Sequence, residues 1–234
     1  MVWRCKVKST QTLPSTYILY NNFRPTKWRK TNWVLYLLGV ALAWLSYSFL
    51  RRLAEILRPD FQPHPLQFQT PTLERLGAIL VLAGILAIVF AVHELIHAIF
   101  LYFFTRYFPS LVAGAGGLAI RLHGWYIPRD EFLIANLAPF VVITFLGVFL
   151  LPAVPQSDIS LIVFFTAMNI AGSIFDIFSS AYLFLHPPSI YLETEGKIYF
   201  NENADLNAVP AWKVRARSLI EAAIDKLDSI NGAG

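Results

Sequence analysis

The sequence predicts an all-α polytopic membrane protein with about four transmembrane helices, a small β-hairpin element and a C-terminal amphipathic helix. The first observation is composition: 56% of the 234 residues are hydrophobic and only 15% are charged, whereas a soluble domain usually carries about a quarter charged residues. The second observation is that the apolar residues gather into runs long enough to cross a bilayer. Together these observations exclude a water-soluble globular protein.

Four apolar runs pass the length test for a membrane helix. They cover residues 33–50, 76–104, 132–151 and 159–185. The second and fourth runs are longer than the bilayer core requires, so we expect these helices to tilt or to project beyond it. The chain is then divided into an N-terminal tail at 1–32, a four-helix membrane domain at 33–185 and a C-terminal tail at 186–234.

The C-terminal tail contains two predicted elements. Residues 190–194 and 197–201 flank Glu195-Gly196, and this pattern is typical of a β-hairpin. Between about residues 212 and 230, apolar side chains recur on one helical face. These side chains are Leu219, Ile220, Ala223, Ile224 and Leu227. We expect this helix to pack on the hairpin; contact with the membrane or with a partner is the alternative.

Lysine and arginine are distributed unevenly around the four runs, and this bias sets the orientation of a membrane protein. The two tails and the second loop share a side and carry 15 of the 19 basic residues, against four in the first loop. We therefore expect a multi-pass protein with both termini in the cytosol. The basic residues flank the apolar runs and form no patch interleaved with stacking aromatics, so nucleic acid is not an expected partner.

The second run contains His93-Glu94-Leu95-Ile96-His97, which has the His-Glu-x-x-His (HExxH) spacing of zinc metallohydrolases. Four helical residues advance about 400° and about 6 Å, so both imidazoles leave one face and can chelate one ion. Glu94 is then close enough to address a metal-bound water without being a ligand. Ionisable residues inside a span are costly and usually mark function. The alternatives are a proton relay and a polar cluster of satisfied core residues.

A catalytic zinc site usually has three protein ligands, so a further ligand is needed. Apart from Glu94, Asp176 is the only acidic residue deep in a predicted span. His93 and Asp176 each lie 17 residues past the start of their run. If the two helices are parallel, equal offsets put both side chains at one depth. Asp176 is therefore a candidate metal ligand, with a structural hydrogen-bond anchor as the alternative.

Two further features lie near these residues. Asn169 is two helical turns before Asp176, where it could contact substrate or donate to an oxyanion; a clasp between helices is the slightly favoured alternative. The Gly-rich segment 110–125 predicts a re-entrant or hairpin element that presents an edge strand to an extended substrate. Within it, His123 is expected at the surface rather than as a fourth ligand, because three protein ligands suffice.

These motifs resemble the site-2 protease-like group of membrane-embedded zinc metalloproteases, and most closely the small bacterial family described as "putative zincin peptidase". The matching features are the His-Glu-Leu-Ile-His motif, the Gly-rich segment, a third span with Asn136 and Pro139, and the stretch 169–176. The resemblance covers roughly residues 76–200.

The resemblance implies a three-helix catalytic core, which we place at 76–185. It implies that zinc (Zn2+) is held by His93, His97 and Asp176, and that Glu94 is the catalytic acid-base. It also implies an active site near the cytosolic side, in agreement with the distribution of basic residues.

The predicted function is a membrane-embedded zinc metallopeptidase that hydrolyses peptide bonds of membrane-associated substrates. Zinc would lower the pKa of its bound water, and Glu94 would take the proton of that water and return it to the leaving amine. The expected partners are the lipid bilayer and a membrane-protein or juxtamembrane peptide substrate. The alternatives are a non-proteolytic metal-binding membrane scaffold or inactive protease relative and, less favoured, a proton or metal transporter.

Overall fold

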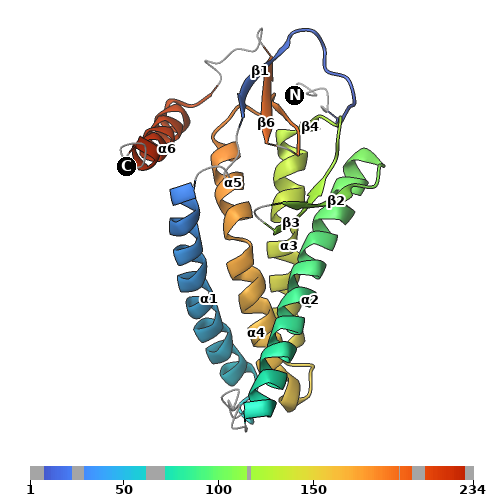
Figure 1. Ribbon diagram of the computed structural model, residues 1–234, viewed down its shortest axis with the longest axis vertical. Coiled ribbons are helices and arrows are strands. Elements are labelled where there is room, and N and C mark those ends of the chain that lie inside the picture. Colours follow the sequence, from blue (N-terminus) through green and yellow to red (C-terminus); the bar gives the residue numbers. More distant parts are fainter. Residues whose placement is uncertain are drawn as a thin grey trace. The chain divides into compact units, whose positions relative to one another are not determined.

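The structure is a computed structural model, and it describes residues 8–22, 29–61, 72–114, 117–194, 196–201 and 209–229. The described residues are 67% helical and contain six helices. The helices are α1 Arg29–Leu57, α2 Thr72–Thr105, α3 Arg129–Leu150, α4 Gln156–Gly172, α5 Ile174–Phe184 and α6 Ala211–Ser229 (Figure 1).

Among the described residues, three helices are long and apolar enough to cross a membrane: α1, α2 and α3. The helix pair α4 and α5 passes the same test only if its two members count as one span. The fourth predicted span is therefore wrong as a single helix, because the chain bends by 43° at Ser173 between α4 and α5. The Ser173 hydroxyl donates to the Asn169 carbonyl at 2.8 Å. A serine hydroxyl that hydrogen-bonds to the carbonyl four residues earlier often bends the helix.

The helices also extend beyond the apolar runs that predicted them. Helix α1 begins in the basic tail at Arg29 and continues to Leu57, and α2 begins at Thr72. An apolar run marks the part of a helix that lipid can cover, whereas helical hydrogen bonding continues through flanking Arg, Lys and Glu, which are good helix formers. Hydropathy therefore predicts the helices but underestimates their length.

Six strands accompany the helices in the described ranges. The C-terminal hairpin and the hairpin element at 110–125 account for four of them. Strands β1 Tyr17–Asn22, β4 Ile127–Pro128, β5 Tyr191–Leu192 and β6 Lys197–Asn201 form one antiparallel sheet in the order β1-β6-β5-β4. The predicted hairpin is present as the β5–β6 pair, in which Leu192 lies opposite Ile198. Glu195 lies outside the described residues. The sheet thus recruits β1 and β4, which the sequence did not predict.

A second, two-stranded sheet follows α2. Strands β2 Ser110–Gly114 and β3 Gly117–Arg121 pair in antiparallel register, with Gly114 opposite Gly117. The predicted hairpin element in the Gly-rich segment is therefore present, although residues 115 and 116 lie outside the described ranges. Leu122, which follows β3, is buried in a cluster with Leu101 of α2 and Ala135 of α3.

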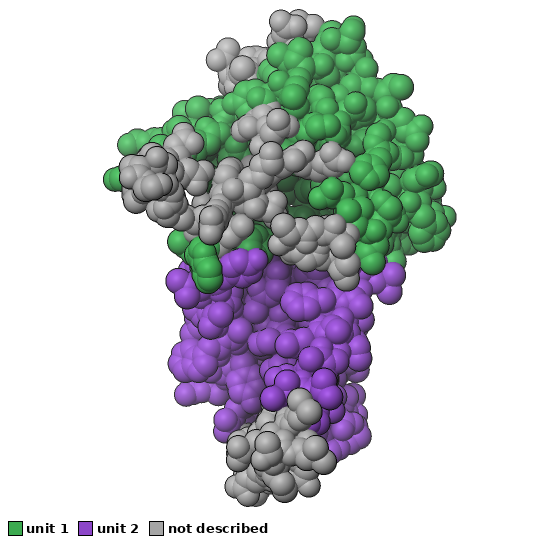
Figure 2. Space-filling view, viewed as in Figure 1, with its two compact units in different colours: residues 1–35, 96–137, 175–234 green, residues 36–95, 138–174 purple. Residues whose placement is uncertain are grey.

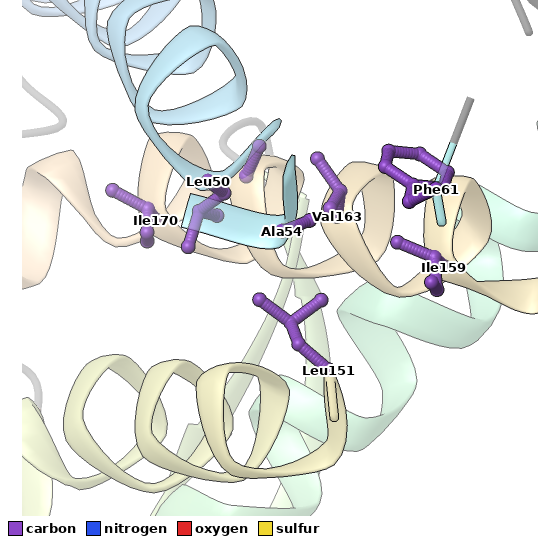
Figure 3. Packing of buried hydrophobic residues seen from close by; sticks show 8 residues of the cluster. Leu50, Ala54, Phe61, Leu151, Ile159, Val163 and Ile170 are labelled. Carbon is purple, nitrogen blue, oxygen red and sulfur yellow. The ribbon is translucent and has the colours of Figure 1, made fainter. Parts of the chain in front are cut away.

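Figure 2 shows the division of the chain into two compact units. Unit 1 contains residues 1–35, 96–137 and 175–234, and unit 2 contains residues 36–95 and 138–174. The core of unit 2 is shown in Figure 3 and consists of Leu50, Ala54, Phe61, Leu151, Ile159, Val163, Ala167 and Ile170. Small residues let its helices approach closely, since a Cβ at Gly147 of α3 would overlap Thr166 of α4.

In unit 1, the C-terminal helix packs where the sequence predicts. Ile220 of α6 packs against a buried cluster formed by Tyr182, Leu183, Ile190, Leu192 and Ile198. Ile224 is buried as well. The predicted face is nevertheless wrong at Leu219, which is 63% exposed, and at Ala223, which is also exposed. The side chain of Leu227 lies outside the described residues. The face that packs is centred on Ile220 and Ile224, so Leu219 points away from the cluster.

His186 lies just past α5 and is only 2% exposed. Its Nδ1 is 3.1 Å from the Tyr182 carbonyl, which can only accept, so Nδ1 carries the hydrogen. Its Nε2 is buried without a hydrogen-bond partner among the described residues. Burial lowers the pKa of His186 to about 4, from an ordinary value of 6.5. Folding therefore holds this ring in its neutral form.

This burial predicts that the protein loses stability as the pH falls. A histidine with a lowered folded-state pKa contributes stability above its unfolded-state pKa, and the contribution is lost as pH falls toward the folded-state value. Between neutral pH and about pH 5 we expect His186 to cost about 2 kcal/mol of unfolding free energy. Thermal unfolding of His186→Phe should show a weaker pH dependence than the wild type. The control His123→Phe alters an exposed histidine and should keep the wild-type dependence; equal curves for both variants would contradict the prediction.

Candidate metal centre

Helix α2 carries the His-Glu-x-x-His motif on a single turn. The ligand atoms of His93, Glu94 and His97 all lie within 4.8 Å of one another. His93 is buried, and the other two side chains are half-buried. Among the described residues, this is the one group of three His, Cys, Asp or Glu side chains close enough to hold a metal ion.

His97 is held by a backbone carbonyl. Its Nδ1 lies 2.9 Å from the Ala135 carbonyl of α3. A carbonyl oxygen only accepts, so Nδ1 is the protonated nitrogen and Nε2 carries the lone pair in the neutral ring. That Nε2 lies 3.6 Å from Oδ2 of Asp176. Within unit 1, one ring nitrogen of His97 is therefore fixed by the protein while the other faces a carboxylate.

Pro139 explains why the Ala135 carbonyl can accept this hydrogen bond. In an α-helix, a carbonyl accepts from the N–H four residues later. The residue four positions after Ala135 is Pro139, which lies inside α3 and has no N–H to donate. The Ala135 carbonyl thus lacks its usual helical donor, and the His97 ring supplies one.

His93 is fixed in the same tautomer by an asparagine. Asn169 of α4 is 1% exposed. Its Nδ2 donates to the Pro139 carbonyl at 3.2 Å, which turns its Oδ1 toward Nδ1 of His93 at 3.0 Å. Because Oδ1 only accepts, Nδ1 of His93 must donate, and its Nε2 carries the lone pair. Both ends of the Asn169 amide are engaged in this way, which favours the clasp over contact with an oxyanion.

Asp176 lies in the first turn of α5, just after the break at Ser173. Asn136 of α3 holds this turn, because its Nδ2 lies 2.9 Å from the main-chain oxygen of Asp176. The same amide nitrogen lies 2.9 Å from the hydroxyls of Ser179 and Ser180. Asn136 therefore positions the backbone that carries the Asp176 carboxylate.

The residues present fit a zinc-type ion. Metal-bound histidines usually donate their second ring N–H to a carbonyl or carboxylate, as His93 and His97 do. Two ligand atoms on a tetrahedral zinc lie about 3.3 Å apart, given bonds of about 2.0–2.1 Å. The 3.6 Å between His97 Nε2 and Asp176 Oδ2 is close to this separation and long for a hydrogen bond. Imidazole and carboxylate donors also suit zinc.

Asn169, which contacts His93, was predicted as a possible clasp, whereas the other groups that orient the candidate ligands were not predicted. The Ala135 carbonyl had a signal, since a proline inside a helix always frees the carbonyl four residues earlier. No sequence signal pointed to the Pro139 carbonyl or to the hydroxyls of Ser179 and Ser180, because their partners lie on other helices. His123 is exposed, next to Gly124.

Replacing Pro139 by alanine should weaken metal binding. The new N–H would compete with His97 for the Ala135 carbonyl, and loss of such an orienting hydrogen bond typically costs about 10–100-fold in metal affinity. Titration of purified protein with Co2+, followed by its visible absorption, measures this change. Val141→Ala alters an exposed residue of the same helix and should leave the affinity unchanged. Wild-type affinity in Pro139→Ala would show that the carbonyl does not position His97.

The arrangement defines a candidate metallohydrolase centre on a helix long and apolar enough to span a membrane. Residues 86–191 match the model of a family described as "putative zincin peptidase". The matched segment contains the motif on α2 as well as Asn169 and Asp176. The predicted resemblance to this family is confirmed over that segment, whereas the likeness to the wider site-2 protease-like group stays a prediction. No curated protein and no solved structure matches the chain.

Proposed function

We propose that the protein is a membrane-embedded zinc metallopeptidase whose metal is held by His93, His97 and Asp176. The observation that carries the proposal is the shared tautomer of the two histidines: each donates from Nδ1 and keeps its lone pair on Nε2. The 3.6 Å separation between His97 and Asp176 supports the third ligand. The family match over residues 86–191 supports the peptidase class.

The chain's own residues supply the rest of the chemistry. A bound zinc ion acidifies water and polarises a carbonyl. The Glu94 carboxylate, on the same helical turn as both histidines, accepts the proton of the attacking water. It then delivers this proton to the nitrogen of the leaving amine, so that the peptide bond breaks without releasing a strong base. The Nδ1 hydrogen bonds keep both rings from rotating during this cycle.

The β2–β3 hairpin is suited to hold an extended substrate. The sheet has only two strands among the described residues, so each strand has one side without a ladder partner. Such a side can bind an extended peptide by strand addition. Ile120 of β3 packs against the cluster that contains Leu101, one turn after His97 on α2. We therefore infer a membrane-protein or juxtamembrane peptide substrate that is extended at the bond to be cut.

The four-stranded sheet supports a topology with four crossings. Strand β1 precedes α1, β4 lies between α2 and α3, and β5 and β6 follow α5. An open antiparallel sheet leaves main-chain donors and acceptors unpaired at its edges, which lipid does not tolerate, so the sheet stays on one side of the membrane. The helices between its strands must then cross an even number of times. This favours counting α4 and α5 as one span, and the excess of Lys and Arg favours a cytosolic location for both termini.

Reconstitution in lipid nanodiscs tests the proposal. Wild-type protein is expected to hold one zinc ion per chain and to cleave membrane-anchored reporters that carry an extended juxtamembrane segment. A chelator should abolish cleavage, and added zinc should restore it. Absence of metal from gently purified protein would contradict the proposal. Metal-dependent flux into liposomes without cleavage would instead identify a transporter.

A further inference from the structure

The first turn of α6 contacts the C-terminal end of α5 in unit 1. Lys213, in its first turn, donates to the Phe184 carbonyl at 3.0 Å and lies 3.6 Å from the centre of the Phe184 ring. Phe184 is the last residue of α5. Arg129, the first residue of α3, donates to the His186 carbonyl just past that end. The start of α6 is therefore fixed at the level where α3 begins and α5 finishes.

The two faces of α6 differ in their surroundings. The inner face carries Ile220 and Ile224, and its Glu221 accepts from the hydroxyl of Tyr182 at 2.9 Å. On the other side, exposed side chains recur three or four residues apart and so form one stripe along the helix. This outer stripe consists of Trp212, Arg215, Leu219, Ala222 and Lys226.

The outer stripe combines apolar and basic side chains and contains no acidic residue. Trp212 is 59% exposed and Leu219 is 63% exposed. Tryptophan is enriched at the boundary between lipid and water, and basic side chains are attracted to anionic headgroups. A helix with this pattern lies in the plane of the interface with its apolar side chains in the headgroup region. In Figure 1, α6 is inclined to α5 rather than continuing it.

We propose that the outer stripe of α6 docks on the anionic surface of the membrane that holds the spanning helices. The proposal rests on the proposed membrane insertion of these helices and is independent of the zinc chemistry. Lipid is favoured over a protein partner because the Lys213–Phe184 contact puts the first turn of α6 at the end of a span. Arg215 and Lys226 give the stripe the charge that an anionic leaflet attracts.

Site-specific fluorescence in nanodiscs tests the docking. In a Cys5→Ser background, Leu219→Cys carries an environment-sensitive dye, and Ser218→Cys is the matched control because residue 218 is exposed but off the stripe. In discs of phosphatidylcholine with phosphatidylglycerol, the dye at 219 should shift to shorter wavelength and be quenched by brominated lipid. In phosphatidylcholine alone, at high salt, or with Arg215→Gln and Lys226→Gln, the shift should be lost.

Two results would show that the outer stripe does not dock on lipid. Equal spectra at 219 in both lipids would overturn the proposal, as would a shift of the same size at 218. A shift at 219 that requires added cell extract would identify a protein partner instead. Asp176→Ala should leave the lipid-dependent shift intact, so a failed zinc site and a failed docking surface are distinguishable. The double glutamine variant should in turn keep its zinc.

Discussion

Asp176→Ala is expected to purify without stoichiometric zinc, although both histidines of α2 remain. The substitution removes the carboxylate whose Oδ2 lies 3.6 Å from Nε2 of His97. The hydrogen bond from Asn136 goes to the main-chain oxygen of residue 176, so the local backbone keeps that partner. Loss of an outer hydrogen bond costs about 10–100-fold in metal affinity, and loss of a ligand should cost more. Elemental analysis and Co2+ titration of detergent-purified protein measure the effect.

Asp158→Ala is the matched control, because Asp158 is an exposed aspartate in the first turn of α4. It should bind zinc like the wild type. Full zinc occupancy in Asp176→Ala, with unchanged affinity, would show that the third ligand comes from elsewhere. A variant that fails to accumulate can be replaced by Asp176→Asn, which keeps the side-chain volume but weakens the ligand.

Glu94→Gln should retain zinc and lose peptide cleavage. Glutamine has nearly the same shape as glutamate but cannot accept the proton of the attacking water. General acid-base catalysis contributes about 10²–10⁴-fold, so cleavage of the nanodisc reporter should fall by that order. The zinc content should stay at the wild-type value, because the proposed ligands are His93, His97 and Asp176.

Glu55→Gln serves as the control for this substitution. Glu55 lies on α1 and pairs with Arg51 at the surface, so its loss should not change cleavage. If Glu94→Gln still binds zinc and cleaves at the wild-type rate, Glu94 has no role in proton transfer. Both the wild type and Glu94→Gln could bind zinc without cleaving the reporter. If both also complement a cell that lacks the protein, the protein is a metal-binding scaffold.

The membrane helices could be predicted because lipid imposes a simple requirement on the sequence. A spanning segment must satisfy its backbone hydrogen bonds internally and must present apolar side chains to lipid. The runs at 33–50 and 76–104 lie inside α1 and α2 for this reason. The break at Ser173 had no such signal, since Gly172 and Ser173 hardly lower the mean hydropathy of their run. Equal depths for His93 and Asp176 were predicted from a straight helix over 159–185, which the structure does not contain.

The strands were harder to predict than the helices. Strand β4 has only two residues, Ile127 and Pro128, and forms because β5 lies beside it. Strand β1 pairs with β6, near the opposite end of the chain. The preference of a short segment for a sheet depends mainly on the strands next to it. Sequence pattern alone cannot supply these neighbours.

Part of the candidate site could also be predicted from the sequence, and part of it could not. The spacing of His93, Glu94 and His97 follows from helical geometry, so a single helix was enough to group them. Pro139 could have predicted an available carbonyl at Ala135 but not which side chain would use it. The contact between Asn169 and His93 joins two helices, and nothing in either segment identifies the other as its partner.

The pairing of β1 with β6 has a practical consequence for preparing the protein. Five residue pairs join these strands, from Tyr17 with Asn201 to Asn22 with Lys197. Trimming the chain up to α1, a common step in making membrane proteins easier to crystallise, would strip β6 of this neighbour and bare a row of main-chain donors and acceptors. Rows of this kind pair with strands from other molecules, so purification tags are better added ahead of β1 than substituted for it.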